Sequence, residues 1–267
     1  MRRLASIFFI FMKTRIKGNV QYRGAFWLDT VTFVLGYGTT SIIMFLTIDK
    51  FDTINGWLPF EVVLLYAYVL ASYTLANTFL SGVLFSISRH IHSGDFDQSL
   101  TKPLHPILYE MATSFSDYYF LHFFLSIAMI IFCSVNLAIT FTFFNVLILV
   151  TSILGGALIQ GGVFILFSSA SFGLIVNPLN SGLFNNIRPL SEIPISIFPR
   201  VFQIILTTII PLAFVAFYPA QNLLAKEDSL YLPQVVQNLS LPIGIVFFLF
   251  SLLVWNFAMR FYKSTGS

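Results

Sequence analysis

The chain carries very little charge. Of its 267 residues only 9% are Asp, Glu, Lys or Arg, whereas 57% are hydrophobic and 32 are Phe. Soluble domains average about 25% charged residues, and a basic nucleic-acid-binding surface needs more still. The composition therefore argues against a soluble enzyme, and the net charge of +3 indicates no nucleic-acid partner.

Three signatures of chemistry are also missing from the sequence. The single cysteine, Cys133, falls inside an apolar run, so no internal disulfide or Cys-rich metal site can form. His90 and His92 stand two apart, without a third ligand at a recognisable spacing, so no metal site is predicted. No G-x-x-x-x-G-K-[ST] phosphate loop follows the glycine pairs at 155–156 and 161–162. We expect a chain that is not an enzyme and binds no cofactor of its own, so any ATP hydrolysis must occur on another chain.

Long apolar runs dominate instead. Six of them are long enough to cross a hydrocarbon core of about 30 Å at about 1.5 Å per helical residue. They are Ala25–Thr47, Val62–Ile87, Met111–Val135, Asn145–Val176, Val201–Leu224 and Ser240–Met259. The sequence predicts an all-α membrane protein with about six transmembrane helices. Because no repeat or linker marks a second unit, we expect a single transmembrane domain over 1–267.

The basic residues orient these spans. With the N-terminus in the cytoplasm, only Lys50 and Lys226 of the 14 Lys and Arg residues fall outside. The inner side receives Arg2, Arg3, Lys13, Arg15, Lys17, Arg23, Arg89, Lys102, Arg188, Arg200, Arg260 and Lys263. Short cytoplasmic loops are enriched in Lys and Arg, and an even number of spans returns the C-terminus to the same side. Both termini are therefore predicted to be cytoplasmic. Arg188 and Arg200 either anchor the inner end of the fifth span at lipid headgroups, which we favour, or bind substrate.

The segment 1–23 has an amphipathic pattern. On a helical wheel Leu4, Ile7, Phe8, Phe11 and Met12 share one side, opposite Arg3, Lys13 and Lys17. This pattern predicts a helix lying in the inner membrane interface, in contact with lipid. A short cytoplasmic extension before the first span is the alternative.

The connection 88–110 is the longest predicted cytoplasmic segment. A glycine and a Lys-Pro pair punctuate it, which predicts a short helix over 95–101. Phe96 and Leu100, four residues apart, would share one face of that helix. A short helix with an apolar face is suited to docking into a groove on a soluble partner.

Three motifs resemble one known family. The stretch Gly94-Asp95-Phe96-Asp97…Leu100…Lys102-Pro103…Pro106 resembles the G-[DE]-x-D-x-x-L-x-[KR]-P-x-x-P segment of a six-span subgroup of ABC type-2 transporter permeases. The stretch 193–200, IPISIFPR, continued by PLAF at 211–214 and YPA at 218–220, resembles that subgroup's YPxxIYP…LPxAFxxYxPA pattern. The tail FYKSTGS at 261–267 resembles its RYxSxGS ending. The likeness extends from end to end.

The resemblance implies a half-transporter, most simply an exporter, in the plasma (inner) membrane of a bacterium. Its coupling helix would rest on a separate ATPase subunit, through Arg89, Gly94, Asp95, Phe96, Asp97, Leu100, Lys102 and Pro103. Two such ATPase subunits, which would bind ATP and Mg, and a second permease, identical or related, are the implied partners. The family also implies that the first, second and fifth spans line the translocation path.

Polar residues within the spans leave two interpretations open. Asp117 and His122 lie in the inner half of the third span, where they either line the path or pair near the interface. Gln160, near the middle of the fourth span, either contacts substrate or makes the interhelical hydrogen bond that we favour. Small residues four apart in the same span, such as Ser152 and Gly156, serve either packing within the chain or contact with a second permease.

Two prolines disturb the fifth run. Pro211 interrupts it and Pro219 follows near its outer end, so a kink or break is expected. By resemblance, Tyr218 and Pro219 would belong to a gate formed by re-entrant outer helices over 218–237. An ordinary outer loop is the alternative.

Two functions of other classes remain as alternatives. An intramembrane enzyme acting on lipid-linked substrates would need polar groups converging at one depth, yet Asp117 and His122 are five residues apart, beyond the spacing of helix-face neighbours. No nucleophile, metal or cofactor motif supports this function. A membrane scaffold without transport would have no ATPase partner.

Overall fold

The computed structural model describes residues 10, 13–14, 23–173, 179–226, 230 and 232–263. Within these residues the chain forms helices and no named strand. The longer helices are α2 (Arg23–Asp49), α3 (Pro59–Phe85), α7 (Tyr118–Asn136), α8 (Phe143–Ser169) and α13 (Ser240–Ala258). The shorter ones are α4 (Ile87–Ser93), α5 (Asp95–Leu100), α6 (Pro106–Thr113), α9 (Leu179–Ile187), α10 (Arg200–Thr208), α11 (Phe217–Leu223) and α12 (Gln234–Gln237). The predicted interfacial helix over 1–23 lies almost entirely outside the described residues.

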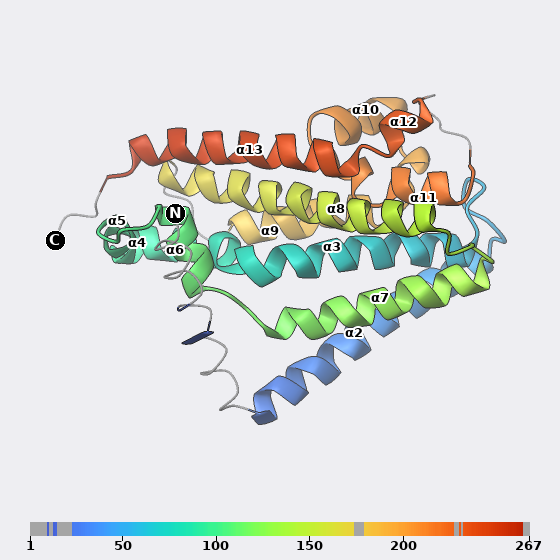
Figure 1. Cartoon of the computed structure of the whole chain (residues 1–267), viewed down its shortest axis with the longest axis horizontal. Coiled ribbons are helices and arrows are strands. Elements are labelled where there is room, and N and C mark those ends of the chain that lie inside the picture. The colour runs from blue at the N-terminus through green and yellow to red at the C-terminus, as the bar shows by residue number, and fades with distance from the viewer. Residues whose placement is uncertain are drawn as a thin grey trace.

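Helix α3 is the axis of the bundle. It is apolar on every side, as expected for a helix surrounded by others, and it packs against α2, α6, α7, α8, α9 and α11 (Figure 1). Its start is fixed by Pro59 at the first helical position and by Glu61, whose carboxylate accepts the Leu58 backbone N–H at 2.7 Å.

Helices α8 and α13 run side by side in the same direction (Figure 1). Gly155 lies against Gly244 at one end of the contact, and Phe172 lies against Trp255 at the other. A Cβ atom on Gly155 would overlap the backbone of Ser240, so the two helices approach more closely than any larger residue allows. At this position the small residues of the fourth run serve packing within the chain.

Five helices of the described part are long and apolar enough to cross a membrane, one fewer than predicted. They are Trp27–Asp49, Pro59–Ser93, Tyr118–Asn136, Phe143–Phe172 and Ser240–Phe261. The predicted fifth span, Val201–Leu224, is not one helix: α10 ends at Thr208 and α11 begins at Phe217. Pro211 has no N–H to continue the helix, and arms of nine and seven residues reach only about 14 and 10 Å.

Residues 179–197, and not Val201–Leu224, carry the chain from one end of the bundle to the other. We call this segment the fifth passage. Helix α9 leads from the end of α8, and Phe184 stacks on Tyr73 near the middle of α3, with ring centroids 5.9 Å apart. The carbonyl of Ser196 then accepts a hydrogen bond from Asn55, in the loop before α3, at 2.8 Å. Prolines and short 3-10 turns break this passage, which is why hydropathy alone did not find it.

This path corrects two placements made from the basic residues. Arg200 begins α10 four residues after Ser196, at the end of the bundle opposite α4–α6, and not at the predicted inner end. Arg188 follows α9 and lies over the ring of Tyr73 at 4.6 Å, at the level of the middle of α3. The positive-inside count misplaced both because it assumed the wrong fifth span.

Residues 200–226 form a hairpin whose two ends both lie at the end of the bundle where α3 begins. Lys226, just after α11, pairs with Glu61 in the first turn of α3 at 2.9 Å. At the turn, Val215 lies beside Gly156 in the middle of α8. The hairpin is therefore deep and apolar, and the predicted segment 218–237 covers only its returning arm and α12.

Candidate functional site

Helices α4, α5 and α6 pack together at the end of α3 and form what we call the inner-end cluster (Figure 1). Gly94 joins α4 to α5 with a φ of 80°, a left-handed conformation that favours glycine. Helix α5 begins at Asp95 and ends at Leu100, so the predicted helix over 95–101 is confirmed to within a residue.

A buried carboxylate holds the cluster together. Glu110 of α6 is 1% exposed, and its two oxygens meet the other two helices. Ser99 of α5 donates to Oε1 at 2.6 Å, and Nδ1 of His90 of α4 lies 3.1 Å from Oε2. A buried carboxylate with both oxygens partnered resists separation of the helices that supply its partners. Sequence reasoning missed this role, because Glu110 simply ended the loop and its partners are 11 and 20 residues away.

Phe96 connects the cluster to the rest of the molecule. Its ring is fully buried, with centroids 5.2 Å from Phe172, which follows α8, and 5.0 Å from Tyr262, which follows α13. The Tyr262 hydroxyl also donates to Asp97 at 2.8 Å. Burial, followed by the contact with Asp97, raises the pKa of Tyr262 to about 12. Helix α5 is thus attached to the ends of two long helices.

Phe96 and Leu100, predicted to share one face of α5, differ in exposure. Phe96 points into the protein, whereas Leu100 is 48% exposed. Phe172 and Tyr262 cover Phe96, so of these two residues Leu100 is the one left open to a partner. Among the other predicted coupling residues, Arg89, Asp95 and Pro103 are exposed, and Gly94, Asp97 and Lys102 are half-buried.

His122, on α7, is buried within the protein, in an aromatic cluster near the middle of α3. Its ring centroid is 4.0 Å from that of Phe33 and 5.9 Å from that of Tyr37, both on α2. Tyr119 of α7 makes an edge contact with it at 5.6 Å. Asp117, five residues earlier, occupies the N-cap position of α7 and is half-buried.

Gln160 makes an interhelical hydrogen bond. Its amide Nε2 donates to the hydroxyl of Ser72 at 2.6 Å and to the carbonyl of Val69 at 3.2 Å, both on α3. This is the structural interaction that the sequence favoured over substrate contact.

An ion pair between a half-buried arginine and a buried glutamate, which the sequence analysis missed, lies beside the aromatic cluster. Nε of Arg188 is 2.9 Å from Oε1 of Glu192, and the guanidinium stacks on Tyr73. Tyr73 is 14 residues into α3, about 20 Å along its axis, far from either end. The spacing of four between Arg188 and Glu192 was the available signal.

A polar contact joins the hairpin arms. The hydroxyl of Tyr218, on α11, lies 3.0 Å from that of Thr207, on α10. Pro211 occupies the break between the arms, and Pro219 lies in the first turn of α11, where no helical hydrogen bond is lost. A cavity of about 800 Å³ separates this hairpin from α13 and is lined mostly by apolar side chains.

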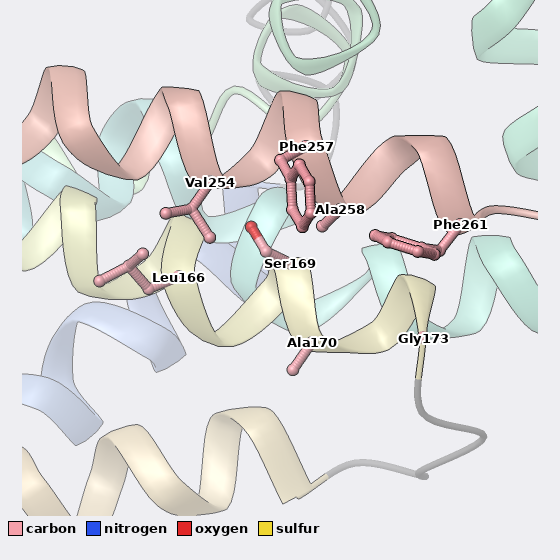
Figure 2. Close-up of a pocket in the computed structure, with 8 residues that line it drawn as sticks. All are labelled: Leu166, Ser169, Ala170, Gly173, Val254, Phe257, Ala258 and Phe261. Carbon is pink, nitrogen blue, oxygen red and sulfur yellow. The ribbon is translucent and has the colours of Figure 1, made fainter.

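A second apolar groove, of about 420 Å³, lies between the ends of α8 and α13, next to the inner-end cluster. Figure 2 shows its walls: Leu166, Ser169, Ala170 and Gly173 on one side, and Val254, Phe257, Ala258 and Phe261 on the other. Its lining holds one hydroxyl and no ionisable group, so it offers no acid, base or nucleophile pair. Across the described part of the chain, no three His, Cys, Asp or Glu residues gather as a metal site would require.

Comparison with known proteins fits this architecture. No curated protein and no solved structure matches the chain. A family model described as "ABC-2 family transporter protein" matches residues 34–266, which include most of α2, the inner-end cluster, the hairpin and α13. The chain therefore belongs to the ABC-2 family of transporter membrane proteins, as a multi-pass permease component.

Proposed function

We propose that the chain is the permease subunit of an ATP-driven exporter and that α5 receives the movement of a separate ATPase subunit. The family match supports a permease, and because the sequence contains no phosphate loop we assign the binding of ATP and Mg to the partner. Two ATPase subunits and a second permease, identical or related, complete the proposed assembly. The inner-end cluster then faces the cytoplasm, as do both termini, in a bacterial plasma membrane.

The observation that carries this proposal is the position of Phe96. Because its ring is enclosed by Phe172 and Tyr262, displacement of α5 must also displace the ends of α8 and α13. Through Gly94 and α4, the same movement reaches α3. A small helix at the surface is thereby connected to three of the long helices.

The partner contact is assigned to the exposed side of α5. Leu100 presents an exposed apolar side chain beside the exposed polar residues Gln98 and Thr101, so it offers a partner an apolar contact with a polar border. The Glu110 network keeps α4, α5 and α6 in one arrangement, so force applied at Leu100 is not lost in local bending.

The hairpin is assigned as the outer gate. The contact between Tyr218 and Thr207 ties its two arms together, and its turn reaches the middle of α8. Backbone that turns within a membrane domain is tolerated only where protein or water surrounds it, and residues 211–221 are buried by the protein.

The test begins with purification of the tagged chain from its native membrane in mild detergent, followed by identification of co-purified proteins and an ATPase assay. We expect a phosphate-loop ATPase in stoichiometric amount. Leu100→Glu should lose that subunit while the permease stays monodisperse, and Phe51→Glu, an equally apolar exposed site at the opposite end, should retain it. A chain that purifies alone and without ATPase activity would favour the scaffold or lipid-enzyme functions instead.

A further inference from the structure

We propose that Arg188 is a substrate-recognition residue that selects amphiphiles carrying an anionic group, such as a phosphate or carboxylate on an apolar body. This inference rests on the proposed transport function and names the substrate class. It starts from the ion pair of Arg188 and Glu192 at the level of the middle of α3.

The position of this pair is costly for a membrane protein. Ionisable groups at such depth are expensive, and they usually face a path or a protein interior. An apolar pair of similar size would often be at least as stable as a buried ion pair. Packing alone therefore does not account for the choice of Arg and Glu here.

The accessible member of the pair is the cation. The Arg188 side chain is 21% exposed, whereas that of Glu192 is 7% exposed. A guanidinium carries five N–H donors, and only Nε lies at ion-pair distance, 2.9 Å, from Oε1 of Glu192. The planar donor edge of arginine matches the two oxygens of a phosphate or carboxylate. An approaching ligand thus meets positive charge first.

A cationic ligand fits less well. The face of Tyr73, the surface that would bind a cation, is already covered by the guanidinium 4.6 Å from its centroid. Glu192 is the deeper of the two charges and is engaged by Arg188.

The surroundings favour an amphiphile over a free anion. Tyr37 of α2, Tyr66 and Tyr73 of α3 all lie close enough to interact electrostatically with Arg188. Tyrosines combine an apolar ring with a hydroxyl donor, which suits an apolar body beside an anionic group. Nδ1 of His122, buried against Tyr37, has no hydrogen-bond partner among the described residues and is a further polar group for a ligand.

We place the entry route to the site on the side of α2. Only 6% of an apolar stretch of α2 is buried, so this helix is held by few contacts compared with its neighbours. A shift of α2 away from α3 would expose Tyr37, Tyr66 and Arg188 without disturbing the contact between α8 and α13.

The experiment measures binding to the purified full-length chain in a neutral maltoside detergent. Dodecyl phosphate, dodecyl trimethylammonium and inorganic phosphate are titrated below micellar concentrations, and the unfolding temperature is recorded. We expect dodecyl phosphate to stabilise the chain, with the other two at least about tenfold weaker. Equal effects of the two C12 compounds, or full stabilisation by inorganic phosphate, would overturn the proposal.

Variants separate recognition from structure. Arg188→Gln should weaken dodecyl phosphate binding at least about tenfold, whereas Arg200→Gln, an exposed arginine elsewhere, should leave it unchanged. Glu192→Gln removes the competing carboxylate and should strengthen binding, and Arg188→Lys should retain part of it. If Arg188→Gln does not fold, these last two variants decide. Weaker binding in Glu192→Gln, or wild-type binding in a folded Arg188→Gln, would show that the pair is structural. Because no ATPase subunit is needed, failure of the coupling proposal would leave this result unchanged.

Discussion

Helices α2 and α3 have the same length and similar composition but opposite environments. Each has 27 residues and an apolar stretch long enough to cross a membrane. In α3, 89% of that stretch is buried by the protein, whereas in α2 the figure is 6%. Hydrophobicity therefore identifies a span but does not reveal whether protein or lipid surrounds it.

The polar side chains of α2 and α3 also differ in what they bond to. Inside α3, Ser72 pairs with Gln160 of α8. On α2, Thr32 and Thr40 return their hydroxyls to carbonyls of their own helix. Thr74 and Thr78 of α3 also donate to carbonyls of their own helix, so the buried helix adds bonds between helices to those within it. The apolar face of α2 remains for lipid or the proposed second permease.

The largest expected effect comes from adding bulk where helices touch. Gly155→Leu would drive a side chain into the backbone of Ser240 and should cost more than about 3 kcal/mol, or prevent folding. Gly36→Leu on α2 meets nothing within 4 Å and should be neutral. Yield of monodisperse protein and its unfolding temperature check both variants. Comparable yields would contradict the close contact of α8 and α13.

Next in size is the difference between a buried and an exposed apolar residue of α5. Phe96→Ala removes a fully buried ring and should destabilise the inner-end cluster by about 3–5 kcal/mol. Leu100→Ala, on the exposed side, should cost less than about 0.5 kcal/mol. Limited proteolysis within residues 86–105 measures this local stability. Equal protease sensitivity of the two variants would show that Phe96 does not hold the cluster.

A smaller effect is expected from the hydrogen bond between α3 and α8. Gln160→Leu should lose about 1 kcal/mol, since interhelical hydrogen bonds in membranes contribute modestly. Thr32→Val on α2 is the matched control, because it removes only a bond within one helix. Unfolding titrations of each variant, and of Ser72→Ala with Gln160→Leu combined, test whether the two side chains act as a pair. Strict additivity would indicate that they do not.

The smallest expected effect concerns Tyr262. Because its folded pKa is raised to about 12, the stability it contributes is complete below its ordinary value near 10 and is lost as pH rises from about 10 to 12. Tyr262→Phe keeps the ring contact with Phe96 but removes the donor to Asp97. The wild type should therefore lose its small advantage over this variant across that alkaline range. A constant difference between them would contradict the assigned hydrogen bond.

Local patterns in the sequence predicted much of the fold. The first four and the last long helices follow from unbroken apolar runs, and α5 follows from Gly94 and the Lys102-Pro103 pair. The fifth passage could not be found this way, because prolines and short turns break 179–197 while the hairpin at 200–226 carries a more continuous apolar run. A hydropathy profile assigns a span to the longer apolar run even when, as here, that run folds back on itself as a hairpin.

The site was predicted less completely than the fold. The motif identified α5, but spacing alone placed Phe96 and Leu100 together, whereas contacts with residues 76 and 166 positions away bury only Phe96. The partners of Glu110 are also set by tertiary packing. The predicted position of Arg188 at the inner end was wrong, because its depth in the bundle depends on which residues form the fifth passage.

The central claim is that α5 contacts an ATPase through Leu100, and thiol cross-linking tests it most directly. The only cysteine, Cys133, is buried, so a Cys133→Ser background leaves reagents a single target. Leu100→Cys, carrying a short photoactivated cross-linker in native membranes, is predicted to form an adduct with a phosphate-loop ATPase. Leu35→Cys, exposed on α2, is predicted not to form that adduct. An ATPase that co-purifies with the chain yet never cross-links to position 100 would contradict the account.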